Sequence, residues 1–242
     1  MNKELIEHFN KQCETFNIIP SEIQIRQLID YYEMLVEKNK VMNLTAITEP
    51  QEVLEKHFLD SISIVKAVDL TKVHTLLDVG TGAGFPGIPL KIIFPELSVT
   101  LLDSLNKRVL FLKEVCEKLG LQDITCIHSR AEEAARNPEF RENFDLVTSR
   151  AVANLSTLSE YCIPFVKKSG CFISYKAEEV SEEVENSKTA FRILGGQLEK
   201  TVSFALPDTD IHRNLIVIRK IKDTPKRFPR KAGIPSKTPI ER

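Results

Sequence analysis

Short apolar runs alternate with helical patterns through most of the chain after residue 73, and this alternation restricts the fold more than any other feature. The runs are HTLLDVG, SVTLLDS, DITCIHS, FDLVTSR, GCFISYK, VSFALPD and RNLIVIRK. Apolar runs of this length are typical of strands buried on both faces, and segments such as residues 107–119 have helical spacing. The pattern predicts an α/β fold with a doubly wound, mostly parallel, seven-stranded sheet. Only residues 207–212 separate the last two runs, so we expect these strands to pair antiparallel.

The residues before this alternation, 1–70, are predicted to form a helical extension. After Ser21, a plausible helix cap, six apolar residues recur at helical spacing: Ile25, Leu28, Ile29, Tyr32, Leu35 and Val36. A second helix is predicted where Thr48 and Gln51 have capping-box spacing and Pro50 suits the first turn. We therefore divide the chain into the extension, a Rossmann-like domain over residues 71–221 and a tail over residues 222–242.

The tail is basic although the whole chain has a net charge of −1. Nine Lys and Arg residues face two acids between Arg219 and Arg242. A cationic tail on an acidic body suits a polyanionic partner, and a solvated tail that aids solubility is the alternative. Four prolines in the tail predict that it has no regular structure: Pro225, Pro229, Pro235 and Pro239.

Two sequence features bear on the location of the protein. The five cysteines have neither zinc-ligand nor CxxC spacing, so free thiols and no metal are expected. The N-terminus has no signal-peptide pattern and no run of about 18 uncharged apolar residues occurs. These features predict a soluble, cytoplasmic protein that does not bind a membrane.

A glycine-rich turn, DVGTGAGFPG at residues 78–87, follows the first strand and predicts a nucleotide-like cofactor. Residues 82–87 also fit the dinucleotide fingerprint GxGxxG, which leaves a nicotinamide-dependent oxidoreductase open. Asp78, an acid at the strand end, favours S-adenosylmethionine, because this methyl donor has a cationic amino-acid end and no pyrophosphate. The candidate contacts in the turn are Asp78, Gly80, Gly82, Gly84 and Phe85.

Further candidates follow the next three strands, where ligands bind in such sheets. Asp103 would accept hydrogen bonds from ribose hydroxyls, or it caps a helix. Ala131 and Glu132 would frame an adenine, or they merely begin a helix. Arg150 would face the acceptor, or it forms a surface ion pair.

Motifs that are missing narrow the chemistry. The fourth strand is followed by SRAVANL, without the Asn/Asp-Pro-Pro-aromatic segment common in methyltransferases that act on exocyclic amines. Cys162 reads as a buried apolar residue, which argues against covalent catalysis. Guanine N7 has a lone pair and no proton, so it can attack the donor methyl when it is well positioned, and Arg150 is the candidate for that positioning. His57, Asp60 and Ser61 fit a polar stripe better than a catalytic constellation.

Several segments together resemble the bacterial glucose-inhibited division protein B family, which methylates guanine N7 in small-subunit ribosomal RNA. They are Asn43-Leu44-Thr45, HFLDS, DVGTGAGFPGIP, LLDSLNKRVLFL, Arg130-Ala131-Glu132, SRAVA and FPRKAGIPSKTPI. The resemblance implies a class I methyltransferase fold and a target guanine in the decoding-region loop of 16S rRNA. Carried over by position, it implies donor contacts at Gly80, Phe85, Ala131, Glu132 and Arg150; Asp78 and Asp103 are added from the chemistry above.

The resemblance also gives the basic tail a partner, either 16S rRNA or the 30S subunit. Five cations would neutralise phosphates and Phe228 would stack on an unpaired base. The cations are Lys222, Lys226, Arg227, Arg230 and Lys231. We expect a monomeric enzyme, and a non-catalytic RNA-binding assembly factor with a methyltransferase fold is the alternative.

Overall fold

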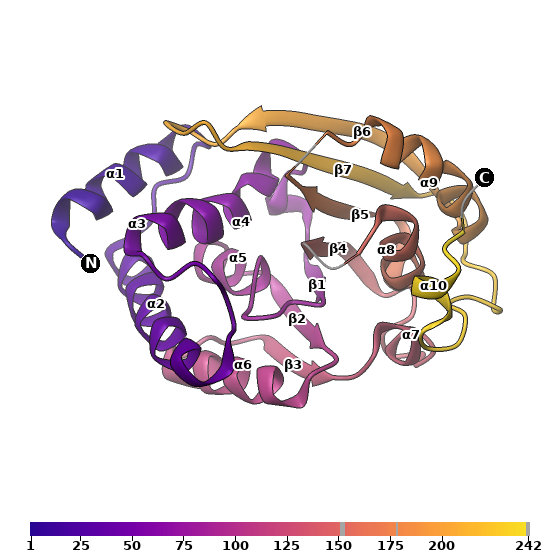
Figure 1. Ribbon diagram of the computed structural model, residues 1–242, viewed down its shortest axis with the longest axis horizontal. Coiled ribbons are helices and arrows are strands. Elements are labelled where there is room, and N and C mark those ends of the chain that lie inside the picture. The colour runs from indigo at the N-terminus through magenta and orange to yellow at the C-terminus, as the bar shows by residue number, and fades with distance from the viewer. Residues whose placement is uncertain (151–152, 178, 241–242) are drawn as a thin grey trace.

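The computed structural model describes residues 1–150, 153–177 and 179–240, and it contains one seven-stranded sheet (Figure 1). The strand order is β3-β2-β1-β4-β5-β7-β6. The first five strands are parallel, and β7 pairs antiparallel with both β5 and β6, as predicted for the last two strands. The strands are β1 (Thr75–Val79), β2 (Ser98–Asp103), β3 (Ile124–His128), β4 (Phe144–Arg150), β5 (Val166–Lys176), β6 (Gly196–Ala205) and β7 (His212–Lys220).

Helices cover both faces of the sheet because neighbouring residues of each central strand point to opposite sides. Leu76 packs in one hydrophobic cluster and Leu77 in the other. The first cluster joins the sheet to α1 (Lys3–Glu14), α2 (Glu22–Met42), η1 (Leu54–Leu59), α4 (Asp60–Ile62), α5 (Gly87–Ile93) and α6 (Asn106–Lys118). The second joins it to α7 (Ala131–Ala134), α8 (Leu155–Cys162), η4 (Ile163–Phe165) and α9 (Ser181–Leu194).

The N-terminal helices belong to the same hydrophobic cluster as the sheet. Phe9 of α1 and Tyr31 of α2 are fully buried in it. Ser21 caps α2 in a capping box with Gln24, which confirms the predicted helix start.

The capping box predicted for the next helix is wrong. This helix, α3 (Pro50–Val53), has Glu49 before it and no side-chain cap, and Gln51 instead donates to Glu55. Pro50 occupies the first helical position, the place that its fixed φ favours, which moves the helix start one residue past Thr48. From there η1 and α4 continue, followed by the short turns η2 (Ser63–Lys66) and η3 (Leu70–Lys72).

The prediction that the tail has no regular structure is wrong at one place. Ile234–Lys237 form a short helix, α10, beside α8 (Figure 1). Pro235 lies in its first turn, where a missing N–H breaks no helical hydrogen bond. Within the described ranges, no helix combines the length and the apolar character needed to cross a bilayer.

Candidate functional site

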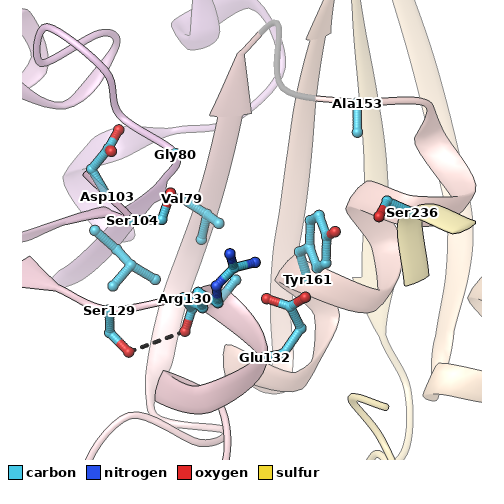
Figure 2. A pocket seen from close by; sticks show the side chains of 12 residues that line it. Val79, Gly80, Asp103, Ser104, Ser129, Arg130, Glu132, Ala153, Tyr161 and Ser236 are labelled. Atoms are coloured by element: carbon cyan, nitrogen blue, oxygen red, sulfur yellow. Dashed lines mark hydrogen bonds between the residues drawn. The ribbon is translucent and has the colours of Figure 1, made fainter. Parts of the chain in front are cut away.

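Two hollows lie side by side at the carboxyl ends of the parallel strands, and both are lined by Gly80, Asp103 and Ser104. The first hollow, of about 260 Å³, extends toward α7, α8 and α10 (Figure 2). It is also lined by Val79, Leu102, Ser129, Arg130, Ala131, Glu132, Ala153, Tyr161 and Ser236. The second hollow, of about 380 Å³, extends toward η1 and is also lined by Leu44, Thr45, His57, Thr81, Gly82, Ala83, Phe85, Arg108 and Arg150.

The glycine-rich turn between β1 and α5 is held from below by Asp78. Its carboxylate is fully buried and accepts hydrogen bonds from Thr81 Oγ1 at 2.6 Å and from the Gly87 N–H at 3.0 Å. Burial raises the pKa of Asp78 to about 6, against the opposing effect of these hydrogen bonds. Asp78 lines neither hollow, and its carboxylate shapes the turn from below. Its predicted contact with the cofactor stays a prediction.

The glycines of the turn have different tasks. Gly80 and Gly82 have φ of 69° and 63° and line the hollows, where bare backbone lets a ligand approach. Gly84, at φ 112°, lines neither hollow; a Cβ there would lie 2.6 Å from the Tyr31 hydroxyl oxygen. That hydroxyl donates to the Ala83 carbonyl at 2.6 Å, so α2 supports the turn through a tyrosine that the apolar stripe did not single out.

Asp103 lies at the end of β2 between the two hollows. Its Oδ2 accepts from the Gly82 N–H at 3.0 Å, its Oδ1 accepts from the Leu105 N–H at 2.8 Å, and Arg108 lies 3.5 Å away. A carboxylate has about four acceptor positions, so it keeps capacity for a ligand hydroxyl. The alternative that Asp103 caps a helix is wrong, because the N-cap of α6 is Leu105 and no side chain caps this helix. Asp103 borders both hollows.

Ala131 and Glu132 begin α7 and line the first hollow, where the sequence predicts the adenine. Glu132 is 5% exposed, and its Oε1 accepts from the Gly233 N–H at 2.9 Å. Figure 2 shows Glu132, Tyr161 and Ser236 on one side of this hollow, and Asp103 with Gly80 on the other.

Arg150 lies at the end of β4 in the wall of the second hollow. Its guanidinium donates to Asp60 Oδ2 at 2.8 Å and to the Lys56 carbonyl at 3.2 Å, and it lies 5.0 Å from the Phe85 ring centroid. The partner carboxylate of Asp60 is almost fully buried and also accepts from Arg213 at 2.7 Å. The ion pair between Arg150 and Asp60 is thus part of the wall of the second hollow. That Arg150 faces the acceptor stays a prediction. The following residues of the SRAVA segment, Ala151 and Val152, lie outside the described residues.

His57 completes this wall. Its ring stacks on Phe85 with centroids 4.4 Å apart, Nε2 lies 2.8 Å from Thr45 Oγ1, and Nδ1 lies 3.3 Å from Arg150 Nη2. Nδ1 also lies 3.2 Å from the Lys56 carbonyl, so both ring nitrogens have hydrogen-bonding neighbours in the wall. Burial, followed by the charge of Arg150, lowers the pKa of His57 to about 3. The imidazole is therefore neutral at pH 7.

The tail residues divide into two groups. Phe228 is only 7% exposed and packs in the second hydrophobic cluster, which leaves little of its ring available to a base. Arg230 is paired with the buried Glu160, so its charge is already balanced within the protein, and its contact with phosphate stays a prediction. The composition of the tail could not predict the burial of Phe228 or the ion pair of Arg230, because the residues that they contact lie far away in the sequence. The remaining predicted cations are exposed: Lys222, Lys226, Arg227 and Lys231.

Among the lining residues that were not singled out from the sequence are Thr45, Arg108, Tyr161 and Ser236. Thr45, Arg108 and Ser236 lie in segments that carry the family resemblance, and Tyr161 does not. Among the described residues, no group of three or more His, Cys, Asp or Glu side chains could hold a metal ion. Cys162 is fully buried.

Comparisons with known proteins agree on one family. The family model described as GidB, rRNA small subunit methyltransferase G, matches residues 24–216. The chain is 56% identical over 219 residues to the ribosomal RNA small subunit methyltransferase G of Lachnoclostridium phytofermentans, covering 90% of each chain. It is 51% identical to the protein of the same name from Bacillus subtilis, covering 98% of this chain and 99% of that one.

Solved structures share the fold at low sequence identity. A SAM-dependent methyltransferase from Aquifex aeolicus matches with a TM-score of 0.52 and 21% identity, covering 77% of this chain and 98% of that one. A SAM-dependent O-methyltransferase from Thermotoga maritima matches with a TM-score of 0.52 and 15% identity, covering 79% and 72%. These likenesses place the sheet among methyltransferase folds.

Proposed function

Because the chain belongs to the rRNA small subunit methyltransferase G family, we propose that it transfers the methyl group of S-adenosylmethionine to N7 of one guanine in the decoding-region loop of 16S rRNA. The observation that carries the proposal is the pair of adjoining hollows. One is suited to the donor nucleoside and the other to a base, and they meet at Gly80 and Asp103.

The first hollow fits the adenosine half of the donor. Asp103 retains acceptor capacity for the ribose hydroxyls, and Ala131 and Glu132 border the space for a flat base. Carboxylates on both sides of the hollow suit a ligand without phosphate, which also disfavours a nicotinamide dinucleotide. Gly80, Gly82 and Phe85 would then border the methionine half.

The second hollow fits the acceptor base. When bound, the donor supplies a methyl group on a sulfonium, and guanine N7 needs only a lone pair to accept it. His57 is neutral, and its two ring nitrogens contact Thr45 on one side and Arg150 with the Lys56 carbonyl on the other, so its hydrogen-bonding capacity is used in holding the wall. Arg150 and Phe85 would position the base, and no side chain is required to remove a proton.

The exposed cations of the tail suit the rRNA partner. Lys222, Lys226, Arg227 and Lys231 are free of ion pairs with residues that the structure describes, so each can contact a phosphate. An unpaired loop is also the RNA context in which guanine N7 is accessible, since the deep major groove of an A-form helix hides it.

The decisive experiment is tritiated methyl transfer to 30S subunits and to naked 16S rRNA from cells that lack the enzyme, followed by nucleoside analysis. Label in 7-methylguanosine is the expected result. Label in another nucleoside would retain the methyl transfer and discard the guanine assignment. No label beside an active control enzyme would favour the RNA-binding assembly factor.

A further inference from the structure

We infer that residues 228–238, called the strap below, hold Ser236 in the wall of the first hollow and in this way help to bind the adenine of the methyl donor. The inference rests on the proposed function, because it needs the donor in this hollow. The strap follows the last strand and lies outside the part of the chain that the family model matches, residues 24–216. The sequence favoured RNA contacts for this segment.

The beginning of the strap is fixed to the body by buried polar contacts. Arg230 donates to Glu160 Oε1 from its backbone N–H at 2.7 Å and from Nε at 2.9 Å, and to Oε2 from Nη2 at 2.6 Å. The Glu160 side chain is 1% exposed. Charge-assisted bonds to a buried carboxylate are among the strongest in proteins. Phe228 packs in the second hydrophobic cluster, and Arg136 Nη2 donates to the Pro229 carbonyl at 2.7 Å.

The later part of the strap is held from both sides of the hollow. The Gly233 N–H donates to Glu132 of α7, and Thr157 Oγ1 of α8 donates to the Pro235 carbonyl at 3.1 Å. Pro235 is buried by this contact. The strap therefore bridges α7 and α8, and this brings Ser236 to the rim of the hollow opposite Asp103 (Figure 2).

The groups at this end of the hollow match the edge of an adenine. No hydrogen bond besides that of Gly233 reaches the Glu132 carboxylate from the described residues, so one oxygen can accept from an exocyclic amine. The Tyr161 hydroxyl can donate to a ring nitrogen, and burial raises the pKa of Tyr161, which keeps it protonated. The Ser236 hydroxyl donates to the Gly233 carbonyl at 3.2 Å, so its oxygen can accept from the exocyclic amine. Hypoxanthine has a carbonyl where adenine has the exocyclic amine. That carbonyl oxygen cannot donate to the Glu132 carboxylate and would be repelled by it.

The test is isothermal titration of S-adenosylhomocysteine and of S-inosylhomocysteine into the full chain and three variants, without RNA. Deletion of residues 232–242 keeps Phe228 and Arg230 and should raise the Kd for S-adenosylhomocysteine by about tenfold or more. The deletion should also reduce the preference for adenine over hypoxanthine, because Glu132 loses the Gly233 N–H that orients it. Ser236→Ala should raise the Kd by about 2- to 10-fold, the effect of one hydrogen bond.

Lys237→Ala is the matched control, since Lys237 is the exposed neighbour of Ser236 on α10, and its Kd should stay within about twofold. A deletion variant that binds both ligands like the full chain would overturn the inference and leave the proposed function standing. A full chain that binds neither ligand would instead overturn the donor assignment itself. Thermal unfolding of each variant separates loss of the strap from loss of the fold.

Discussion

At the scale of single residues, the wall of the second hollow depends on an uncharged imidazole. His57 is enclosed by Phe85 and lies beside the Arg150 guanidinium, so a proton on the ring would meet both desolvation and a like charge. The neutral ring adds no charge beside Arg150 and leaves that cation to Asp60. Beside His57 the wall therefore carries the charge of Arg150 and no second charge on the imidazole.

We predict that acid destabilises the protein partly through His57. Its pKa is about 3 in the folded protein and 6.5 when exposed, so between these values the unfolded chain binds more protons. Stability is therefore full above about pH 6.5 and is lost as the pH falls toward 3. From pH 7 to pH 5, the wild type should lose about 2 kcal/mol more unfolding free energy than His57→Gln, as measured by urea denaturation.

Asp78 contributes the opposite slope, because its raised pKa lets the folded state bind more protons between pH 3.8 and about 6. Both proteins contain Asp78, so the comparison cancels its effect. His74→Gln, which changes an exposed imidazole, is the control. Equal losses for the wild type and His57→Gln would show that the ring is charged in the folded protein.

At the scale of elements, the link from β1 to α5 is a turn that packs as tightly as a core. A Cβ at Gly87 would lie 2.3 Å from Leu101 Cδ2 of β2 and 3.1 Å from Asp78 Oδ2. The added methyl therefore collides with the neighbouring strand and with the carboxylate that holds the turn. Since the same turn lines the second hollow, stability and donor affinity should fall together.

We predict that Gly87→Ala lowers the free energy of unfolding by about 1–3 kcal/mol, the usual effect of overpacking, and weakens S-adenosylhomocysteine binding. Gly120→Ala is the control. Gly120 ends α6 at φ +64° with open space around it, so alanine there should lose about 1 kcal/mol and leave donor binding intact. Urea denaturation and titration calorimetry measure both effects. Equal loss of donor affinity in the two variants would contradict the role given to Gly87.

The strands could be predicted because the pattern that indicates them lies within a few consecutive residues. The seven apolar runs predicted every strand and the antiparallel end of the sheet. Burial on both faces explains the continuous runs of central strands such as β1 and β4, whereas the edge strands β3 and β6 are only partly buried. The task of Asp78 was not predictable, because a carboxylate at a strand end can face a ligand or turn back under its own loop. The hydrogen bonds from Thr81 and Gly87 hold the Asp78 carboxylate under its own loop. The glycine-rich turn is also held by a hydrogen bond from Tyr31, which lies on the distant helix α2.

At the scale of the whole molecule, the same limit applies to the tail. Its charge was readable from composition, but pairing of Arg230 with Glu160 and burial of Phe228 depend on how α8 lies against the sheet. The structure thus separates a packed inner side of the tail from exposed cations. The packed side meets the first hollow, and the exposed cations are left for the polyanionic partner.

The last prediction concerns these exposed cations. Changing Lys226, Arg227 and Lys231 to Gln should weaken binding of naked 16S rRNA and lower the slope of log K against log salt by about 2, at roughly 0.7 for each lost contact to unpaired RNA. The matched control changes Lys11, Lys72 and Lys118, exposed residues on α1, before β1 and at the end of α6, to Gln. Filter binding over a salt series measures both slopes. Because the strap keeps its buried anchors, S-adenosylhomocysteine affinity should not change in either variant. Equal slopes for the two triple variants would show that the tail cations do not contact rRNA. The alternative, that the basic tail aids solubility, would then be favoured.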